Sequence, residues 1–366
     1  MKTTFRIMAI ALGICALGVI SIYSSTMGTS DSFWQSHSFR QLTWILIGIA
    51  AFNFFSRFNY RRLWDWMYVI YGFTVFLLFL VFVLGIVRLG AQRWLKVAWF
   101  SLQPSEGAKL IVLIFLARYF SRKSVDTVFL KNRSLGIFKA LLLPFFFVML
   151  PVGFIIEQPD LGSGTIILIL FLAMLFLSNI KFRYLLGIFL CLLIAFPFAW
   201  HSMRPYQKQR IAVFMNPNAD PLGAGYTVTQ SKIAIGSGGF LGKGWLSGTQ
   251  SQLHFLPESH TDFIFSTFSE EWGFVGDMLL LALYFLLINE GFRIAHATSD
   301  DFGRLLSLGI SVLLLIQCAI NAAMNLGLAP IVGIPLPLMS YGGSSVITTF
   351  IALGILANIN KTRAVF

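Results

Sequence analysis

The sequence predicts an all-α integral membrane protein with ten transmembrane helices and both termini in the cytoplasm. Of the 366 residues, 57% are apolar and 11% are charged, whereas about a quarter of the residues in a soluble domain are charged. A spanning helix needs about 20 mostly apolar residues, and ten separate runs meet that requirement. Basic residues also collect in alternate connections between these runs. The composition therefore excludes a soluble multidomain protein, a disordered chain and a secreted disulfide scaffold.

The predicted spans make one polytopic domain over residues 1–366. The first run has the basic start of a signal peptide, with Lys2 and Arg6, but its apolar part is too long and no clean cleavage site follows. It is therefore predicted to be a retained helix. The ten spans are expected near residues 5–25, 41–57, 64–87, 105–121, 134–156, 163–180, 182–201, 264–291, 303–325 and 341–360.

The distribution of charge predicts the orientation. With the N-terminus placed in the cytoplasm, most of the 27 Lys and Arg fall in short inner loops or in the tails, as the positive-inside rule requires. The net charge of +12 is explained by this bias, so no nucleic acid is expected as a partner. The three cysteines all lie inside apolar runs, which argues against disulfides and against a metal site built on them.

Residues 202–263 form the long connection between the seventh and eighth spans, and they are predicted to face the outside. A loop of this length is usually functional or disordered. Its apolar pieces argue against disorder, so a packed cap of short helices that forms part of the site is expected. The chain contains no internal repeat, and the inverted-repeat signature of many secondary transporters is therefore missing.

Several cations lie on the disfavoured outer side, in two groups. Arg88 and Arg93 flank the connection between the third and fourth spans, and Lys208 and Arg210 lie in the long outer segment. An anionic ligand would explain cations gathered there, and an arginine fork suits phosphate oxygens. A solvated basic loop is the plainer interpretation of the second group.

Two short motifs bring carboxylates to the same side. In Q-P-S-E-G-A-K, Glu106 and Lys109 are three residues apart and share a helix face. An ordinary helix start, with Ser105 as its cap, explains part of this motif. In E-Q-P-D-L-G, Glu157 and Asp160 flank a proline. A solvated turn with Asp160 near a helix N-terminus explains that motif equally well.

A third motif, F-L-P-E-S-H-T-D-F-I-F, places Glu258, His260 and Asp262 at the entry to the eighth span. Helix capping would explain one polar residue at that point but not three. A carboxylate near cations at a membrane interface can serve as a general base or as a metal ligand. The acidic residues deeper in this span, such as Glu270, are interpreted as packing groups without a chemical role.

These motifs closely resemble those of the SEDS family, named for shape, elongation, division and sporulation, and in particular its rod-elongation branch. The resemblance extends over essentially the whole chain. The segments that carry it are L-G-A-Q-R-W-L at 89–95, Q-P-S-E-G-A-K-L at 103–110, E-Q-P-D-L-G-S-G-T at 157–165, P-Y-Q-K-Q-R-I at 205–211, D-P-L-G-A-G-Y at 220–226, Q-S-K-I-A-I-G-S-G-G at 230–239, G-T-Q-S-Q-L-H-F-L-P-E-S-H-T-D-F-I-F at 248–265 and P-L-P-L-M-S-Y-G-G-S-S at 335–345.

The resemblance implies a peptidoglycan glycosyltransferase of the bacterial plasma (inner) membrane, acting in cell-wall elongation and the maintenance of cell shape. Such an enzyme polymerises lipid II on the outer face by an inverting transfer, with undecaprenyl pyrophosphate as the leaving group. The implied partners are a class B penicillin-binding protein, which cross-links the new glycan, other membrane proteins of the elongation complex, lipid II and the undecaprenyl-linked glycan.

The resemblance also implies roles for individual residues. The family motif places the essential carboxylate at Asp262, which is expected to be the general base or the ligand of a divalent cation, Mg²⁺ or Mn²⁺. No organic cofactor is expected. Glu106 and Lys109 match a family pair that supports the site. The cations expected at the pyrophosphate are Arg88, Arg93, Lys208 and Arg210. The carboxylates expected to shape the site are Glu157, Asp160 and Glu258.

Two functions of other classes share these features. A lipid II flippase would also need a cationic head-group site, but it predicts charges at mid-depth and on both faces of a pathway. The suspicious charges here gather on the outer side, which favours an enzyme. A non-catalytic scaffold of the elongation machinery would not need Asp262.

Overall fold

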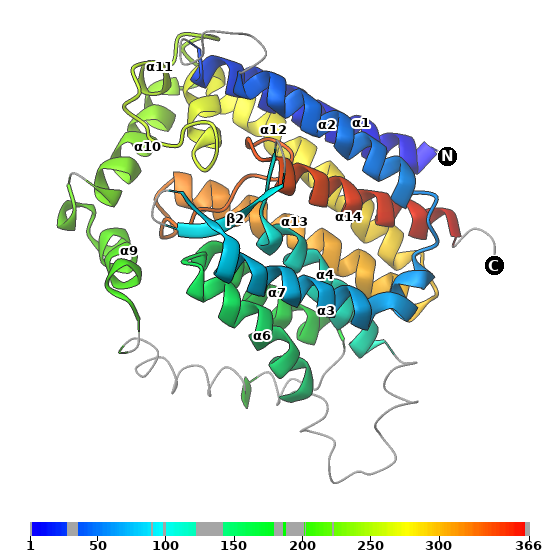
Figure 1. Cartoon of the computed structure of the whole chain (residues 1–366). Coiled ribbons are helices and arrows are strands. Elements are labelled where there is room, and N and C mark those ends of the chain that lie inside the picture. The colour runs from blue at the N-terminus through cyan, green and yellow to red at the C-terminus, as the bar shows by residue number, and fades with distance from the viewer. Residues whose placement is uncertain are drawn as a thin grey trace.

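Long helices that run side by side make up most of the molecule (Figure 1). The computed structural model describes residues 2–27, 36–88, 91–97, 100–121, 142–178, 186–187, 201, 203–221 and 223–362. Its elements, in chain order, are α1 (Lys2–Ser25), α2 (His37–Phe55), α3 (Arg61–Leu84), β1 (Ile86–Arg88), β2 (Ala91–Val97), β3 (Phe100–Leu102), α4 (Pro104–Phe120), α6 (Leu143–Glu157), α7 (Leu161–Leu177), α9 (Pro205–Met215), the 3₁₀ turn η4 (Pro217–Ala219), α10 (Ala224–Gly238), α11 (Thr249–Gln252), α12 (Ile264–His296), α13 (Asp301–Asn325) and α14 (Gly343–Thr362).

Within the described residues, six helices are long and apolar enough to cross a membrane: α1, α2, α3, α12, α13 and α14. Two shorter apolar helices, α6 and α7, also overlap predicted spans, and α4 covers the predicted span at 105–121. The prediction of a helical protein with several membrane spans is confirmed. The predicted span at 182–201 and the start of the one at 134–156 lie almost wholly outside the described residues.

Helix α13 forms the centre of the bundle. It packs against α4, α7, α12 and α14, and its interior face combines apolar side chains with buried Gln317, Asn321 and Asn325. These three polar residues recur every fourth position, so they line one face of the helix. A central helix with a polar stripe requires hydrogen-bonding partners on its neighbours, and the stripe leads towards the end of the bundle where the long outer segment lies.

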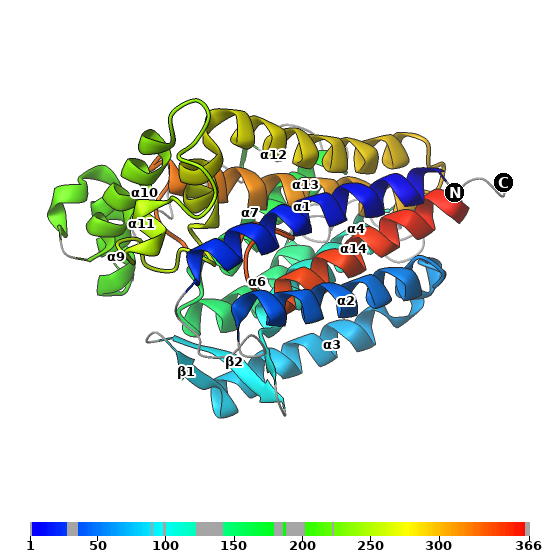
Figure 2. The same cartoon turned by 90° about the horizontal axis from the view of Figure 1, so that it is seen from above.

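The outer segment folds into α9, η4, α10 and α11 at one end of the bundle (Figures 1 and 2). Helix α9 begins at Pro205, whose fixed φ suits the first helical position. The expectation of short helices in this segment is confirmed. The start of α1 and the end of α14 both lie at the opposite end of the bundle, so the two termini share a side.

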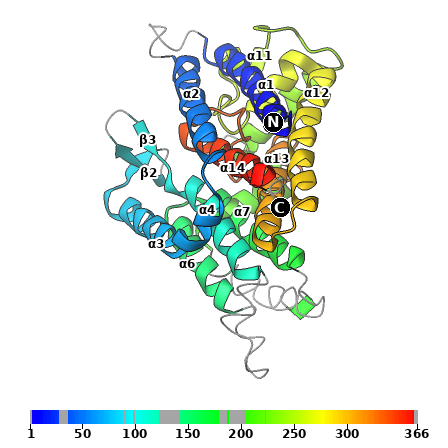
Figure 3. The ribbon, with the colours of Figure 1, turned by 90° about the vertical axis from the view of Figure 1, so that its right-hand side faces the viewer.

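A small antiparallel sheet connects α3 to α4, and the sequence analysis did not predict it. Strand β2 pairs with β1 on one edge and with β3 on the other, and the sheet lies against the ends of α3 and α4 (Figure 3). Strands β1 and β3 have three residues each, which is too short for a recognisable alternation of apolar and polar residues. The sheet matters for the site because β2 carries Arg93.

Helix α12 is broken at Gly273, which has φ 62° and ψ −166°. A break in a membrane helix exposes backbone groups that must find partners inside the protein. Here the partners come from the glycine-rich run at the end of α10. Two backbone amides of this run donate to carbonyls of α12, and two amides of α12 donate to carbonyls of the run. The bonds run from Lys243 N to Glu270 O (3.0 Å), Gly244 N to Glu271 O (3.0 Å), Phe274 N to Gly239 O (3.0 Å) and Val275 N to Phe240 O (3.2 Å).

Glycine is required on both sides of this contact. A Cβ on Gly273 would lie 2.3 Å from the amide nitrogen of Gly242, and a Cβ on Gly242 would lie 2.1 Å from the carbonyl oxygen of Glu271. Both glycines also have positive φ, a region that side chains disfavour. The run G-S-G-G-F-L-G-K-G therefore fastens the outer segment onto α12 backbone to backbone.

Candidate active site

Asp262 lies in the turn that leads into α12. Two residues of the segment before α14 hold this turn, because the Ser340 hydroxyl donates to the carbonyl of Thr261 (2.6 Å) and the amide of Tyr341 donates to the carbonyl of His260 (3.0 Å). The N-cap of α12 is Phe263, and no side chain caps the helix. Capping therefore does not explain the presence of Asp262.

The carboxylate of Asp262 is half-buried and faces cations. A Cβ on Gly333 would lie 3.3 Å from Asp262 Oδ2 and 4.0 Å from Arg93 Nη1, so the missing side chain of Gly333 leaves the space that Asp262 and Arg93 border. Arg210 also interacts electrostatically with Asp262. Within the described residues, no group donates a hydrogen bond to this carboxylate; the bonds to Asp262 end on its backbone carbonyl.

The surroundings raise the pKa of Asp262 from 3.8 to about 6. Loss of hydration is the largest cause, and the negative charge of Glu258 adds to it. Arg93 and Arg210 act in the opposite direction, because they stabilise the ionised form. A carboxylate with this pKa is ionised at neutral pH and is still a stronger base than an ordinary aspartate.

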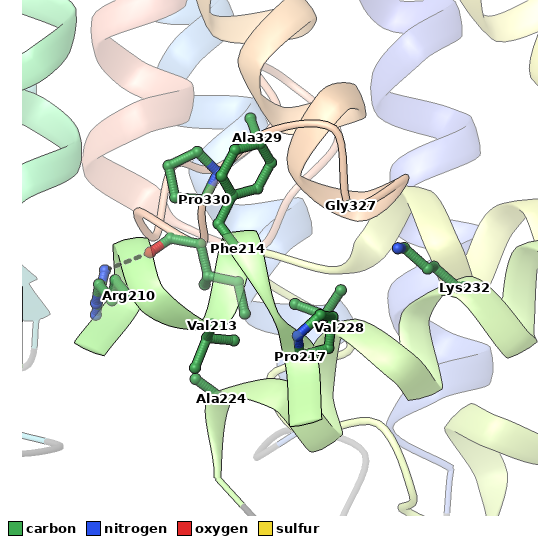
Figure 4. A pocket seen from close by; sticks show the side chains of 11 residues that line it. Arg210, Val213, Phe214, Pro217, Ala224, Val228, Lys232, Gly327, Ala329 and Pro330 are labelled. Carbon is green, nitrogen blue, oxygen red and sulfur yellow. Dashed lines mark hydrogen bonds between the residues drawn. The ribbon is translucent and has the colours of Figure 1, made fainter. Parts of the chain in front are cut away.

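The two arginines reach Asp262 from different elements. Arg93, on β2, donates through Nη2 to the carbonyl of Pro159, while its buried Nε has no hydrogen-bond partner within the described residues. Arg210, on α9, donates through Nη1 to the carbonyl of Ile331 (2.8 Å), as Figure 4 shows. Burial and the nearby Arg93 lower the pKa of Arg210. Two guanidinium groups that influence each other electrostatically suit an anionic ligand.

A groove extends from Arg210 along the inner side of α9 (Figure 4). Apolar side chains of α9, α10 and the segment after α13, among them Val213, Phe214 and Pro330, line it between Arg210 at one end and Lys232 at the other. The hydrogen bond from Arg210 to the carbonyl of Ile331 lies at the edge of this groove.

The other two predicted cations, Lys208 and Arg88, come from α9 and β1. Lys208 lies on α9 two positions before Arg210, and side chains two apart on a helix face nearly opposite directions. Its Nζ donates to the carbonyl of His201 (3.3 Å). Arg88 ends strand β1 and pairs with Ala91 through the backbone, but its side chain lies outside the described residues.

Asp160 is the N-cap of α7, as the sequence allowed. Its Oδ1 accepts from the amide of Ser163 (3.2 Å), and its Oδ2 accepts from the Ser105 hydroxyl (2.8 Å) and from Gln103 Nε2 (3.2 Å). Ser105 is therefore not the cap of α4, because that helix begins one residue earlier at Pro104, with Gln103 as its N-cap. Asp160 also contributes negative charge at Asp262 and Arg210.

The other two predicted carboxylates are exposed. Glu157 forms an ion pair with Arg204, and its side chain is 56% exposed; no described contact links it to Asp262. Glu258 accepts from the Thr261 hydroxyl (3.1 Å) and acts electrostatically on Asp262. Its φ of 50° is unusual for a residue with a side chain. Of these two, the structure brings only Glu258 to the Asp262 turn.

Glu106 and Lys109 form a buried ion pair, with 2.6 Å between Oε1 and Nζ and side chains only 4% and 2% exposed. The prediction that both residues lie on one helix face is confirmed. The pair lines a small cavity between α4, α13 and α14, with Gln317 and Thr349 on the other walls. No contact within the described residues joins this pair to Asp262, so any support that it gives the site acts through the packing of α4.

The residues that hold Asp262 in place were not predicted from the sequence. Asn321 and Asn325 of α13 both donate to the carbonyl of Asp262, at 2.9 and 3.1 Å, and Ser340 holds the preceding residue. A signal for the asparagines was present in the sequence, since Gln317, Asn321 and Asn325 recur every fourth residue inside an apolar span. Intramembrane polar residues with that spacing mark a face with buried partners.

The described residues contain no group of three His, Cys, Asp or Glu that could hold a metal ion. Asp262 and Glu258 nevertheless offer carboxylate oxygens beside an anion site. Magnesium is commonly held by one or two carboxylates with phosphate oxygens of the substrate completing its shell. The donors at the Asp262 turn fit that kind of site.

Known proteins resemble this chain over most of its length. The family model described as "Cell cycle protein", for FtsW, RodA and SpoVE, matches residues 5–364. The protein named peptidoglycan glycosyltransferase MrdB of Escherichia coli K12 is 42% identical over 326 residues, which cover 88% of this chain and 85% of that protein. The protein of the same name from Helicobacter pylori is 42% identical over 332 residues, covering 90% of this chain and 84% of that one.

Two solved structures are also similar. A chain of the structure described as "Structural coordination of polymerization and crosslinking by a peptidoglycan synthase complex" has a TM-score of 0.80 and 30% identity, with 98% of each chain covered. The rod shape determining protein RodA of Thermus thermophilus has a TM-score of 0.70 and 28% identity, covering 98% of this chain and 96% of that one. With its helical bundle, its Asp262 turn and these similarities, this chain belongs to the FtsW/RodA/SpoVE family of cell cycle proteins, the SEDS family.

Proposed function

We propose that this protein is a peptidoglycan glycosyltransferase that polymerises lipid II during cell-wall elongation and so maintains cell shape. The curated relatives that are 42% identical to it carry that activity in their names. The observation that supports the chemistry best is the Asp262 carboxylate, which accepts no hydrogen bond from the described residues and faces Arg93 and Arg210. The proposed base and the proposed anion site would thereby lie next to each other.

The reaction that suits this arrangement is an inverting transfer. Asp262 takes the proton of an acceptor sugar hydroxyl, whose oxygen attacks the anomeric carbon of the donor from the side opposite the pyrophosphate. The new β-1,4 bond forms as the bond between that carbon and the pyrophosphate oxygen breaks, without a covalent enzyme intermediate. Arg93 and Arg210 stabilise the negative charge that develops on the undecaprenyl pyrophosphate.

A divalent cation, Mg²⁺ or Mn²⁺, remains part of the proposal. Asp262, with Glu258 beside it, would hold the cation, and oxygens of the pyrophosphate would complete its shell. When bound, it would supply additional positive charge at the leaving group. Asp262 would then be a metal ligand as well as, or instead of, the base.

The predicted roles of the remaining residues follow from where they lie. Glu106 and Lys109 would support the site by fixing α4 against α13 and α14. Asp160 would anchor the turn whose Pro159 carbonyl holds Arg93. Glu157 and Lys208 would act on parts of the substrate outside the Asp262 turn, and Arg88 would contribute charge near the pyrophosphate.

We further propose ten transmembrane spans with cytoplasmic termini, residues 202–263 between spans seven and eight, and an active site that faces the periplasm from the plasma (inner) membrane. The shared side of the two chain ends, opposite α9–α11, supports this topology. The inner-face bias of Lys and Arg supports the same orientation. Lipid II would then react at the surface while its polyprenyl chain stays in the bilayer.

We propose a class B penicillin-binding protein as the working partner, with other membrane proteins of the elongation complex around it. The structural neighbour with the TM-score of 0.80 belongs to a peptidoglycan synthase complex that couples polymerisation to crosslinking. An enzyme that makes glycan strands needs a transpeptidase nearby, because uncrosslinked strands do not form a wall.

The test is polymerisation of lipid II by the purified protein with its cognate transpeptidase, with and without Mg²⁺ or Mn²⁺. Wild type is compared with Asp262→Asn and with Glu157→Gln, a matched loss of one outer carboxylate that no described contact links to Asp262. Glycan strands from wild type and Glu157→Gln but not from Asp262→Asn are expected. Equal synthesis by Asp262→Asn would exclude the proposed mechanism, and no synthesis by any folded variant would favour a lipid II flippase or a scaffold.

A further inference from the structure

Four fully buried polar side chains form a connected cluster beneath Asp262. Ser231 comes from α10, Ser266 from the first turn of α12, and Asn321 and Asn325 from α13, and each residue is 0% exposed. Polar groups buried this completely are stable only if they bond to one another. The hydrogen bonds among these four residues therefore hold α10, the start of α12 and the end of α13 in fixed positions relative to one another.

The asparagines fix the backbone at Asp262. Both side-chain amides donate to the Asp262 carbonyl, and Asn321 also donates to the carbonyl of Ile334 (2.7 Å). Ile334 directly follows Gly333, which borders the Asp262 carboxylate. Asn321 thus ties together the two backbone segments that form the pocket around that carboxylate.

The side chain of Asn325 replaces a backbone hydrogen bond at the start of α12. In a regular helix the amide of Ser266 would donate to the carbonyl of Asp262, four residues earlier. Here that amide donates to Asn325 Oδ1 (3.2 Å) while Asn325 Nδ2 donates to the Asp262 carbonyl (3.1 Å). The side-chain amide is inserted between the two backbone groups. Asp262 is consequently held just outside the helix, with both backbone groups satisfied.

The cluster also extends to the outer segment. The Ser231 hydroxyl donates to the Asn325 carbonyl (2.6 Å), and its oxygen is 2.6 Å from the Ser266 hydroxyl, which donates to Asn325 Oδ1 (2.5 Å). The position of α10 is thereby linked through two side chains to the backbone of Asp262.

We infer that Asn321 and Asn325 are positioning residues for the Asp262 carboxylate, and that Ser231 links their arrangement to the position of α10. This inference rests on the proposed glycosyltransferase function. It assigns the asparagines no contact with substrate. Their effect is to hold the base where it meets the acceptor hydroxyl, so they act on turnover and not on substrate affinity.

The test compares Asn325→Ala and Asn321→Ala with Asn358→Ala. Asn358 is also a buried asparagine that bonds to backbone groups, since its Oδ1 accepts from the Tyr60 amide (3.0 Å) and its Nδ2 donates to the Ser56 carbonyl (3.2 Å). It lies near the end of α14 that is remote from Asp262. The three variants lose the same atoms, but only the first two lose the support of Asp262.

Initial rates of lipid II polymerisation are measured against substrate concentration, per mole of protein that shows a cooperative thermal unfolding transition. Misplacing a reacting group by about 1 Å can cost about 10²-fold in rate, so kcat is expected to fall about 10- to 100-fold in Asn325→Ala and Asn321→Ala. KM should change by less than about twofold, because substrate binding is not affected. Asn358→Ala should keep kcat within about twofold.

A fall in kcat that is equal in all three variants, or a rise in KM with unchanged kcat, would overturn the inference. If the asparagine variants fail to fold, Ser231→Ala decides, because it removes one hydroxyl and leaves both asparagines. In Ser231→Ala we expect kcat to fall about two- to fivefold, which corresponds to the net contribution of about one hydrogen bond. An unchanged kcat would contradict the link to α10. Wild-type protein without polymerase activity would refute the proposed function itself, which is a different outcome.

Discussion

Asp262 and Glu270 are carboxylates at the same end of α12, yet their surroundings are opposite. Glu270 is completely buried and accepts from Lys243 Nζ (2.7 Å), from the Thr249 amide (2.9 Å) and hydroxyl (2.9 Å), and from the Gln250 amide (3.1 Å). The half-buried Asp262 accepts no hydrogen bond on its carboxylate from any residue that the structure describes. Its charged neighbours act only through space.

The difference separates a structural carboxylate from a reactive one. With its acceptor capacity filled, Glu270 fastens the segment after α10 to α12, and it has nothing left to offer a substrate. Asp262 has lost hydration without gaining donors, which raises its pKa. Its remaining hydrogen-bonding capacity is available to a substrate hydroxyl or a cation.

Asp262→Asn should lower activity more than any other substitution considered. Loss of a general base lowers turnover by about 10²–10⁴-fold, and the substitution preserves the size of the side chain. Because no described hydrogen bond is lost, the folded structure should persist, and removal of a poorly hydrated charge should leave thermal stability at neutral pH equal or higher. Glycan strand assays beside thermal unfolding test both parts. A large fall in the unfolding temperature would contradict the comparison with Glu270.

Glu270→Gln should produce the opposite pattern. It leaves Lys243 without its anion and weakens two backbone donors, at an expected cost of about 2–3 kcal/mol in the free energy of unfolding. The measurement is thermal unfolding of the purified protein, with proteolysis of the segment 239–256 as a second probe. Activity per folded molecule should stay close to wild type. If Glu270→Gln were stable but inactive, Glu270 would have a chemical role that the saturated geometry argues against.

Arg210→Gln tests the anion side of the Asp262 site. Removal of one preorganised cation from a developing negative charge should lower kcat about 10- to 100-fold, and the hydrogen bond to the Ile331 carbonyl is lost as well. The matched control is Lys208→Gln on the same helix, whose side chain faces away and whose activity should change by less than about threefold. Equal losses in both variants would indicate that α9 attracts the substrate through its overall charge.

The pH dependence of activity and stability also distinguishes Asp262 from a structural carboxylate. The pKa of Asp262 is raised to about 6, so kcat/KM should fall about tenfold per pH unit below that value and level off above it. For stability the sign is reversed, because the folded state binds this proton more tightly than the unfolded state between pH 3.8 and about 6. The contribution of Asp262 to stability therefore decreases as pH rises through that window. Rates and unfolding temperatures measured between about pH 5 and pH 8, with Asp262→Asn as the reference, would show both trends.

The smallest effect is expected for the exposed pair of Glu157 and Arg204. An exposed ion pair contributes about 0–1 kcal/mol, so Glu157→Gln should change the unfolding temperature little and leave the rate within about twofold. Both are measured in the same assays as the other variants. A strong loss of activity would mean that Glu157 meets the substrate directly, although no described contact links it to the Asp262 turn.

Sequence patterns were sufficient wherever the relevant physics is local. Runs of apolar residues predicted the membrane helices, and the spacing of three between Glu106 and Lys109 predicted that they share a helix face, because both depend on helix geometry alone. Asp262 was identified from an acidic motif at a helix entry together with the family resemblance, and its catalytic role is a prediction. The three-stranded sheet and the cap of α4 were missed or misassigned because short strands and Pro-Ser starts give weak local signals.

The sequence alone predicted a membrane protein with several spans, with most of its cations on one side and its unusual carboxylates on the other. These properties follow from composition and from the order of residues along the chain. Which charged side chains lie near one another depends, by contrast, on the tertiary structure. Arg93 and Arg210 reach Asp262 from a strand and from a separate helix, Lys208 faces away, and Asn325 holds Asp262 outside α12. The physical reason is that such contacts join residues far apart in the chain, so they depend on how the elements pack against one another and not on the local sequence.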